Sequence, residues 1–256
     1  MSIALQVALV MVTILVVLLV IGAPIGVAIG MSSAVSMICM IPADVSFATS
    51  AQRIFAGSNS FSLIAIPFFI LAGNIMNNGG IATRLVNCAK VISGRMPGAL
   101  AQSNVVANML FGAISGSGAA AAAAMGGTIG PLEEKEGYDK NYSTAVNVAS
   151  APVGMLIPPS NTMIVYSSVA GSVSIAALFM AGYIPGLLWG GAVMILAGIM
   201  AKKRGYQAEQ RVPVKVALKT FWQAIPSLLL IVIVIGGILG GIFTATEGSA
   251  IAVVYA

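Results

Sequence analysis

Two short interruptions in an otherwise strongly apolar chain constrain its fold more than any other feature of the sequence. The first lies within residues 111–131, where glycine and serine gather between apolar runs, and the second is the Ile-Pro-Pro-Ser-Asn-Thr stretch at residues 157–162. Lipid offers no hydrogen-bond partners, so non-helical backbone at membrane depth occurs only where protein buries it or where it lines a wet cavity. Paired interruptions of this kind predict a binding site for a solute or an ion within a transporter.

The composition indicates a membrane protein. Of the 256 residues, 59% are hydrophobic and only 7% are charged, whereas a soluble domain carries about 25% charged residues. At about 20 apolar residues per span, the length allows about seven spans and one hairpin. The net charge of +5 comes from Lys and Arg in the few hydrophilic stretches between apolar runs, which is typical of the positive-inside bias and not of a nucleic-acid-binding face. We therefore predict an all-α polytopic membrane protein.

Residues 99–131 decide the predicted topology. As one straight helix this stretch would be about 50 Å long, whereas the hydrocarbon core is about 30 Å thick. A re-entrant helical hairpin that folds at residues 115–118 resolves the mismatch, because arms of about 16 and 13 residues reach only to the midplane. Both ends of the hairpin then lie on the cytoplasmic side. The charged loop at residues 132–141 follows, and its acidic residues Glu133, Glu134 and Glu136 are expected to be solvated.

The second interruption predicts a broken helix over residues 142–170 that runs outward, after which residues 175–200 return inward. This topology places a basic cluster on the cytoplasmic side, as the positive-inside rule requires. The cluster consists of Lys202, Lys203, Arg204, Arg211, Lys215 and Lys219. Residues 224–256 then begin the span–turn–span pattern of residues 3–41 in the opposite orientation, which predicts the start of a second, inverted repeat. Because a second hairpin and a second broken helix do not occur here, we expect the polypeptide to be incomplete.

The chain divides into three predicted parts. Residues 1–98 hold scaffold spans and an amphipathic connector, and residues 99–170 form a transport domain from the hairpin and the broken helix. Residues 171–256 hold the return span, the basic cytoplasmic loop and the start of the second repeat. Glu247, which opens the last apolar run, is expected to have a structural or capping role.

The sequence resembles the large membrane subunit of tripartite ATP-independent periplasmic (TRAP) transporters, within the ion transporter superfamily. The matching stretches, in family order, are Ile-Pro-Phe-Phe-Ile-Leu-Ala-Gly at 66–73, Gly-Ala-Ile-Ser-Gly-Ser at 112–117, Ile-Pro-Pro-Ser at 157–160 and Gly-Ile-Phe-Thr-Ala-Thr-Glu at 241–247. The resemblance implies sodium-driven symport of an organic acid across the bacterial inner membrane by an elevator mechanism. It also implies two partners, a periplasmic substrate-binding protein and a small four-helix membrane subunit.

The residue types at the interruptions suit a sodium ion, because carbonyls freed at helix breaks and Ser or Thr hydroxyls supply oxygen ligands without a buried charge. The candidate sodium ligands are Ser115, Gly116, Ser117, Gly118, Pro158 and Pro159, and the candidate substrate contacts are Ser160, Asn161 and Thr162. Helix N-termini near Ala119 and Ser160 can direct their positive dipole ends at a carboxylate. The alternatives are that each hydroxyl bonds its own helix and that Asn161 only caps the second half-helix.

Other functional classes fit less well. The chain has no histidine, no carboxylate cluster with metal-ligand spacing and no acid or base beside Ser117, so an enzyme is not predicted. A stand-alone ion-coupled organic anion carrier and a channel or scaffolding subunit remain alternatives. Many dicarboxylate-type relatives have an acidic residue soon after the Ser-Gly-Ser turn, where this chain has alanines, so a sugar acid or a keto acid suits it at least as well as a dicarboxylate.

Overall fold

The computed structural model describes residues 3–171, 173–208 and 213–256, and every regular element within them is a helix. This confirms the all-α prediction. The elements are α1 (Ile3–Val20), α2 (Ile25–Met37), α3 (Ala43–Ser58), η1 (Phe61–Ile64), α4 (Ala65–Asn78), α5 (Ile81–Ser93), α6 (Ala99–Ser115), α7 (Gly118–Thr128), α8 (Gly130–Lys135), α9 (Lys140–Ser150), α10 (Val153–Leu156), α11 (Asn161–Ala170), α12 (Ile175–Arg204), α13 (Val214–Leu239) and α14 (Ala245–Tyr255). Arg211 of the predicted basic cluster lies outside the described residues.

Two compact units make up the chain, Met1–Ser60 and Phe61–Ala256. In the first unit, α1 and α2 occupy the stretch in which two spans were predicted, and they are separated by a turn at Gly22 with φ of 86°. None of the residues of α1 is buried, which suits a helix whose apolar side chains face lipid. The Ser46 hydroxyl of α3 donates to the Ala34 carbonyl of α2 at 2.6 Å and joins these two helices.

Three of the described helices are long and apolar enough to cross a membrane, namely α1, α12 and α13. The segments Lys140–Leu156 and Asn161–Ala170 together have the length and apolar composition of a further span, with a bend of 48° between the two parts. The bend is the broken helix that the Pro-Pro stretch predicted. Lys202, Lys203 and Arg204 lie in the last turn of α12, and α13 begins at Val214, before the predicted start of its span at residue 224.

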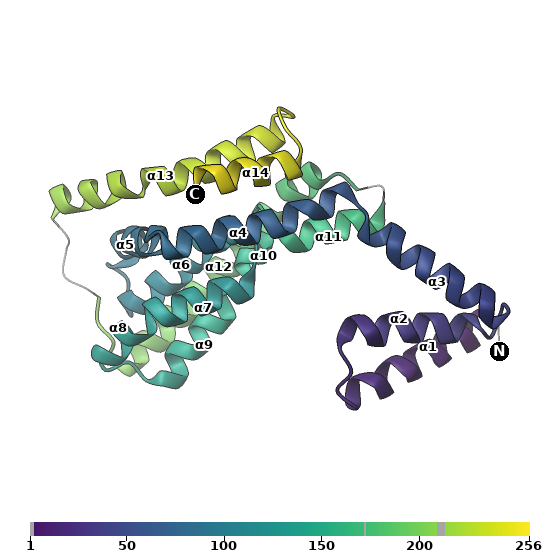
Figure 1. Cartoon of the computed structure of the whole chain (residues 1–256). Helices are drawn as coiled ribbons and strands as arrows, with labels where there is room; N and C mark the ends of the chain where they lie inside the picture. Colours follow the sequence, from purple (N-terminus) through teal and green to yellow (C-terminus); the bar gives the residue numbers. More distant parts are fainter. Residues whose placement is uncertain (1–2, 172, 209–212) are drawn as a thin grey trace. The chain divides into compact units, whose positions relative to one another are not determined.

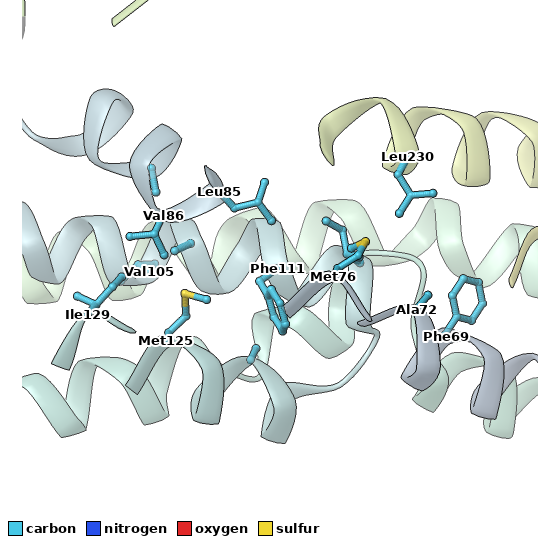
Figure 2. Close-up of a cluster of buried hydrophobic side chains, with 14 of the residues drawn as sticks. Phe69, Ala72, Met76, Leu85, Val86, Val105, Phe111, Met125, Ile129 and Leu230 are labelled. Atoms are coloured by element: carbon cyan, nitrogen blue, oxygen red, sulfur yellow. The ribbon is translucent and has the colours of Figure 1, made fainter. Parts of the chain in front are cut away.

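In the second unit, α6 packs against α5, α9, α10 and α12. Figure 1 shows α13 and α14 side by side along α4 and α5, in agreement with the contacts between these helices. Side chains from α4, α5, α6 and the α7 arm form one buried core, drawn in Figure 2. Among the largest fully buried side chains there are Phe69, Met76, Leu85, Phe111 and Met125.

The predicted hairpin is formed by α6 and α7, which a turn at Gly116 and Ser117 connects. Asn104, near the start of α6, lines the same cavity as Gly126, near the end of α7, and Gly130, at the start of α8, so the two arms run antiparallel. Gly116 has φ of 62°, a conformation that favours glycine. The turn therefore falls inside the predicted range of residues 115–118.

The structure corrects the prediction that Glu133 is solvated. Glu133 is only 1% exposed, whereas Glu134 and Glu136 are exposed as expected. The reason is tertiary: Glu133 lines a cavity together with Asn104 of α6 and Ser143 of α9, which come from distant parts of the chain. The connection between α8 and α9 also folds back, with the Tyr138 amide donating to the Glu133 carbonyl at 2.9 Å.

Glu247 has the predicted capping role. The Thr244 amide donates to the Glu247 carboxylate at 2.7 Å, and the Glu247 amide donates to the Thr244 hydroxyl at 3.3 Å. These two bonds form a capping box, which satisfies donors at the start of α14 that have no partner within the helix.

Candidate functional site

The two interruptions meet in space. The Asn161 amide donates to the Gly116 carbonyl at 3.3 Å, and Asn161 Nδ2 donates to the Ser115 carbonyl at 3.4 Å. A Cβ atom added to Gly116 would lie 3.0 Å from the Pro159 carbonyl oxygen. Residues 45 positions apart in the chain are thus in direct contact, and the hairpin turn and the helix break form one site.

The serines at this site begin helices. Ser117 caps α7, because its Oγ accepts from the Ala120 amide at 3.3 Å. Ser160 caps α11 in the same way, accepting from the Met163 amide at 3.4 Å, and its hydroxyl also donates to the Met155 carbonyl. Asn161 is therefore the first residue of α11 and not its cap, which corrects that alternative.

Because Asn161 does not cap the helix, its side-chain oxygen is not used there. Asn161 Oδ1 is buried and has no hydrogen-bond partner among the described residues. Ser115 Oγ lies 3.4 Å from both the amide and the carbonyl oxygen of Ser117, at the limit of hydrogen-bond distance. An unpaired acceptor next to weakly bonded hydroxyls is the type of oxygen set that a bound cation would complete.

The other predicted site residues lie at varying distances from this junction. Gly118 packs against the residue that follows α9, since an added Cβ would lie 3.0 Å from the Ala151 carbonyl oxygen. Pro158 and Pro159 are buried at the break. Thr162 is exposed and lines a separate, mostly apolar cavity of about 320 Å³ together with Met155 and Tyr166. The structure thus brings the serines, Gly116 and Asn161 together and places Thr162 on another surface.

A cavity of about 320 Å³ adjoins the hairpin turn. Ser115 and Ser117 line it from the turn, Asn74 and Asn77 from α4, and Phe111 from α6. These two asparagines were not among the predicted site residues. The signal available there was the presence of amide side chains at the end of an apolar run, because polar groups at membrane depth often mark a solute pathway.

The electrostatics of the junction come from backbone and not from charged side chains. None of the residues that line the cavity beside the hairpin turn is charged. The N-termini of α7 and α11 both start here, at Gly118 and Asn161. The positive ends of their helix dipoles make the region favourable for an anionic group, while the carbonyl oxygens of the turn suit a cation.

A buried network of Asn and Ser side chains, which was not predicted from the sequence, connects the hairpin to α9. Asn108 of α6 is fully buried, and its Nδ2 lies 2.9 Å from Asn104 Oδ1, 3.0 Å from Asn147 Oδ1 and 2.8 Å from Ser150 Oγ. Asn147 in turn donates to the Ala122 carbonyl of α7 at 2.9 Å. The network links both hairpin arms to α9. Asn at positions i and i+4 in an apolar helix was the available signal.

Comparison with known proteins agrees with this architecture. The model of the family described as the tripartite ATP-independent periplasmic transporter, DctM component, matches residues 12–256. The chain belongs to this family. Membership confirms the predicted resemblance to TRAP large subunits and the multi-pass inner-membrane location. The family consists of transport proteins and not of enzymes, in agreement with the prediction.

Several curated TRAP permeases and one uncharacterized protein are similar to the chain. It is 54% identical over 224 residues to uncharacterized protein YgiK of Salmonella typhimurium, a match that covers 88% of this chain and 52% of that protein. It is 44% identical over 209 residues to the isethionate TRAP transporter permease protein DctMQ of Oleidesulfovibrio alaskensis, covering 80% of this chain and 32% of that protein. It is 42% identical over 214 residues to the C4-dicarboxylate TRAP transporter large permease protein DctM of Vibrio cholerae, covering 83% and 47%. The chain spans about half the length of these relatives or less.

Proposed function

We propose that the chain is part of a secondary active transporter subunit that imports an organic acid by sodium symport. The observation that carries the proposal is the junction of the hairpin turn with the helix break. There, carbonyls, hydroxyls and the unpaired Asn161 Oδ1 offer oxygens to a sodium ion, and two helix N-termini face the same region. This arrangement can bind a cation and an anion close together, which is the chemical requirement for coupling them.

An anionic organic acid is the substrate class that best fits these features. The curated relatives described above that are named for a substrate are named for isethionate and for C4-dicarboxylates, which share acidic groups and little else. Helix N-termini bind carboxylates and sulfonates by the same electrostatic attraction. The absence of a charged residue in the cavity lining leaves selection among acids to shape and to the amides of Asn74 and Asn77.

We further propose that residues 99–170 move as one unit during transport, with residues 1–98 as scaffold. The Asn108 network and the contact of Gly112 with Gly154 tie the hairpin arms to α9 and α10, so this group of helices is suited to moving without internal rearrangement. A small four-helix membrane subunit and a periplasmic substrate-binding protein complete the proposed transporter.

The test is uptake of labelled organic acids into proteoliposomes that contain the full-length large subunit, the small subunit and the binding protein. We expect accumulation only with an inward sodium gradient and only with the binding protein. Sodium-independent flux would indicate a channel, and transport without the binding protein would indicate a stand-alone carrier.

Two variants test the residues. We expect Ser117→Ala and Asn161→Ala to raise the sodium concentration needed for half-maximal uptake about tenfold or more, because each removes one oxygen from the cation, worth about 1–3 kcal/mol. Ser168→Ala is the matched control, since the Ser168 hydroxyl bonds the Ile164 carbonyl of its own helix at 3.0 Å. If both site variants keep the sodium activation of the control, these residues do not form the sodium site.

A further inference from the structure

A buried carboxylate at the base of the hairpin has no role in the proposed function. Glu133 is 1% exposed, and neither oxygen makes a hydrogen bond with a described residue. An ionised carboxylate without a partner costs several kcal/mol when it is buried. In a stable fold, such a group either holds a proton or binds a positive ion.

Glu133 lines a polar cavity of about 360 Å³. Since one water occupies about 30 Å³ of the liquid, the cavity has room for an ion with several waters. Two more of its lining groups are buried and lack partners among the described residues, namely Asn104 Nδ2 and Ser143 Oγ. A hydrated cation would satisfy all three groups, because the carboxylate and the hydroxyl oxygen can bind the ion while the amide donates to one of its waters.

The charges around the cavity leave one negative charge without compensation. Its lining contains two acids, Glu133 and Glu134, and one base, Lys140. Glu134 and Lys140 pair with each other at 3.6 Å, and both side chains are largely exposed. One remaining negative charge suits a monovalent cation, whereas protein sites for divalent ions usually supply several carboxylates.

The surrounding structure fixes Glu133 in this position. The rings of Tyr138 and Tyr206 stack with their centroids 4.3 Å apart, and the Tyr206 hydroxyl accepts from the Asp139 amide at 2.8 Å. Arg204 pairs with Asp139 at 3.0 Å. These contacts attach the connection between α8 and α9 to the end of α12, so the carboxylate cannot easily swing into solvent.

We propose that Glu133 and Ser143 bind a hydrated monovalent cation in this cavity. The site is separate from the candidate sodium ligands at residues 115–118 and 158–159, and it goes beyond the proposed function. By the predicted topology it lies at the cytoplasmic base of the hairpin. An ion here would hold α8 and α9 together at the position where the hairpin joins the broken span.

Protons compete with the cation for the same carboxylate. The pKa of Glu133 is raised from 4.5 to about 7, and burial is the main cause of this rise. The nearby Ser143 hydroxyl lowers the pKa, and the charge of Glu136 raises it by a smaller amount. The other titratable or charged groups near it are Glu134 and Lys140 at the cavity and Tyr142 on α9. If only the ionised carboxylate binds the cation, the half-saturating cation concentration rises about tenfold between pH 8 and pH 6.

Infrared difference spectroscopy of the purified full-length transporter in lipid nanodiscs tests the site. At pH 7, replacing choline chloride with sodium chloride or potassium chloride should convert a protonated carboxyl band into a carboxylate band, with a tenfold higher half-saturating concentration at pH 6 than at pH 8. Glu133→Gln should abolish this conversion. Ser143→Ala should keep the band and raise the half-saturating concentration several-fold, which tests the site even if Glu133→Gln does not fold.

Glu136→Gln is the matched control, because Glu136 is an exposed acid on the same connection. It should keep the response to sodium and potassium, with only a small downward shift of the Glu133 pKa because the charge of Glu136 is removed. Three results would overturn the proposal. The band could respond to pH but not to sodium or potassium, which would make Glu133 a proton site only. It could persist unchanged in Glu133→Gln, or its half-saturation could be the same in Ser143→Ala as in the wild type.

Discussion

Replacing Gly112 with alanine should be among the most damaging single-methyl changes in residues 99–170. A Cβ added to Gly112 would lie 2.1 Å from the Cα of Gly154, and one added to Gly154 would lie 2.6 Å from the Cα of Gly112. Ordinary contact begins near 3.4 Å, so the backbones of α6 and α10 would have to separate by about 1.3 Å. The clashing atoms belong to main chain, and no side-chain rotation can relieve them.

The expected loss of stability follows from this separation. Inserting a methylene into a packed core typically costs about 1–3 kcal/mol, and a radial gap of about 1 Å removes up to half of each dispersion contact around it. We therefore expect a loss of about 3 kcal/mol or more. The break at residues 157–160 would also shift relative to the hairpin turn, so the proposed sodium-driven uptake should fall even in the folded fraction.

The assay is thermal unfolding of the full-length protein in detergent, followed by size-exclusion chromatography, together with uptake into proteoliposomes. Gly127→Ala is the control, because Gly127 is a helical residue of α7 with nothing within 4 Å of an added Cβ. It should be neutral or stabilising by up to about 1 kcal/mol. If Gly112→Ala has the same melting temperature as Gly127→Ala and transports normally, the argument from close backbone contact is refuted.

Two more predictions concern buried polar groups. Asn108→Ala should lower the free energy of unfolding by about 2–4 kcal/mol, because it leaves the amide oxygens of Asn104 and Asn147 without their buried donor. Thermal unfolding measures this loss, with the exposed Asn141→Ala as the control. Equal melting temperatures of the two variants would contradict the role of the network. In choline buffer, the raised pKa of Glu133, about 7 against an ordinary 4.5, means that the folded state binds the proton more tightly. The stability that this group contributes is then complete below about pH 4.5. It is lost as the pH rises through 7, by up to about 3 kcal/mol. The melting temperature should therefore depend less on pH in Glu133→Gln than in the wild type, and an unchanged pH profile would show that Glu133 is hydrated.

The agreement between sequence and structure is best where membrane physics leaves few solutions. The hairpin turn at Gly116 and Ser117, the break before Asn161 and the capping box at Glu247 all follow from local patterns. Each of them depends on the need to satisfy backbone donors and acceptors that lipid cannot satisfy. The domain boundaries, the repeat symmetry and the ion ligands remain predictions.

The sequence was less informative where burial depends on distant residues. Glu133 stands among charged neighbours, and its pattern is that of a solvated loop. Its burial comes from packing beside Asn104 of α6 and Ser143 of α9, which line the same cavity. Tyr138 in the connection to α9 also stacks on Tyr206, which is 68 positions further along the chain. A charge pattern in sequence does not contain such long-range contacts.

By itself, the sequence determined that this chain is helical, lies in a membrane and breaks its helices at two places, because apolar length and backbone hydrogen bonding are local properties. Only the tertiary structure decided which of the polar residues at and beyond these breaks face one another. In the folded chain, Gly116 contacts Asn161, Thr162 lines a different cavity, and Glu133 is buried in a cavity that Ser143 also lines. The reason is that the cost or benefit of a buried polar group depends on the partners that packing brings to it, and those partners come from distant parts of the chain.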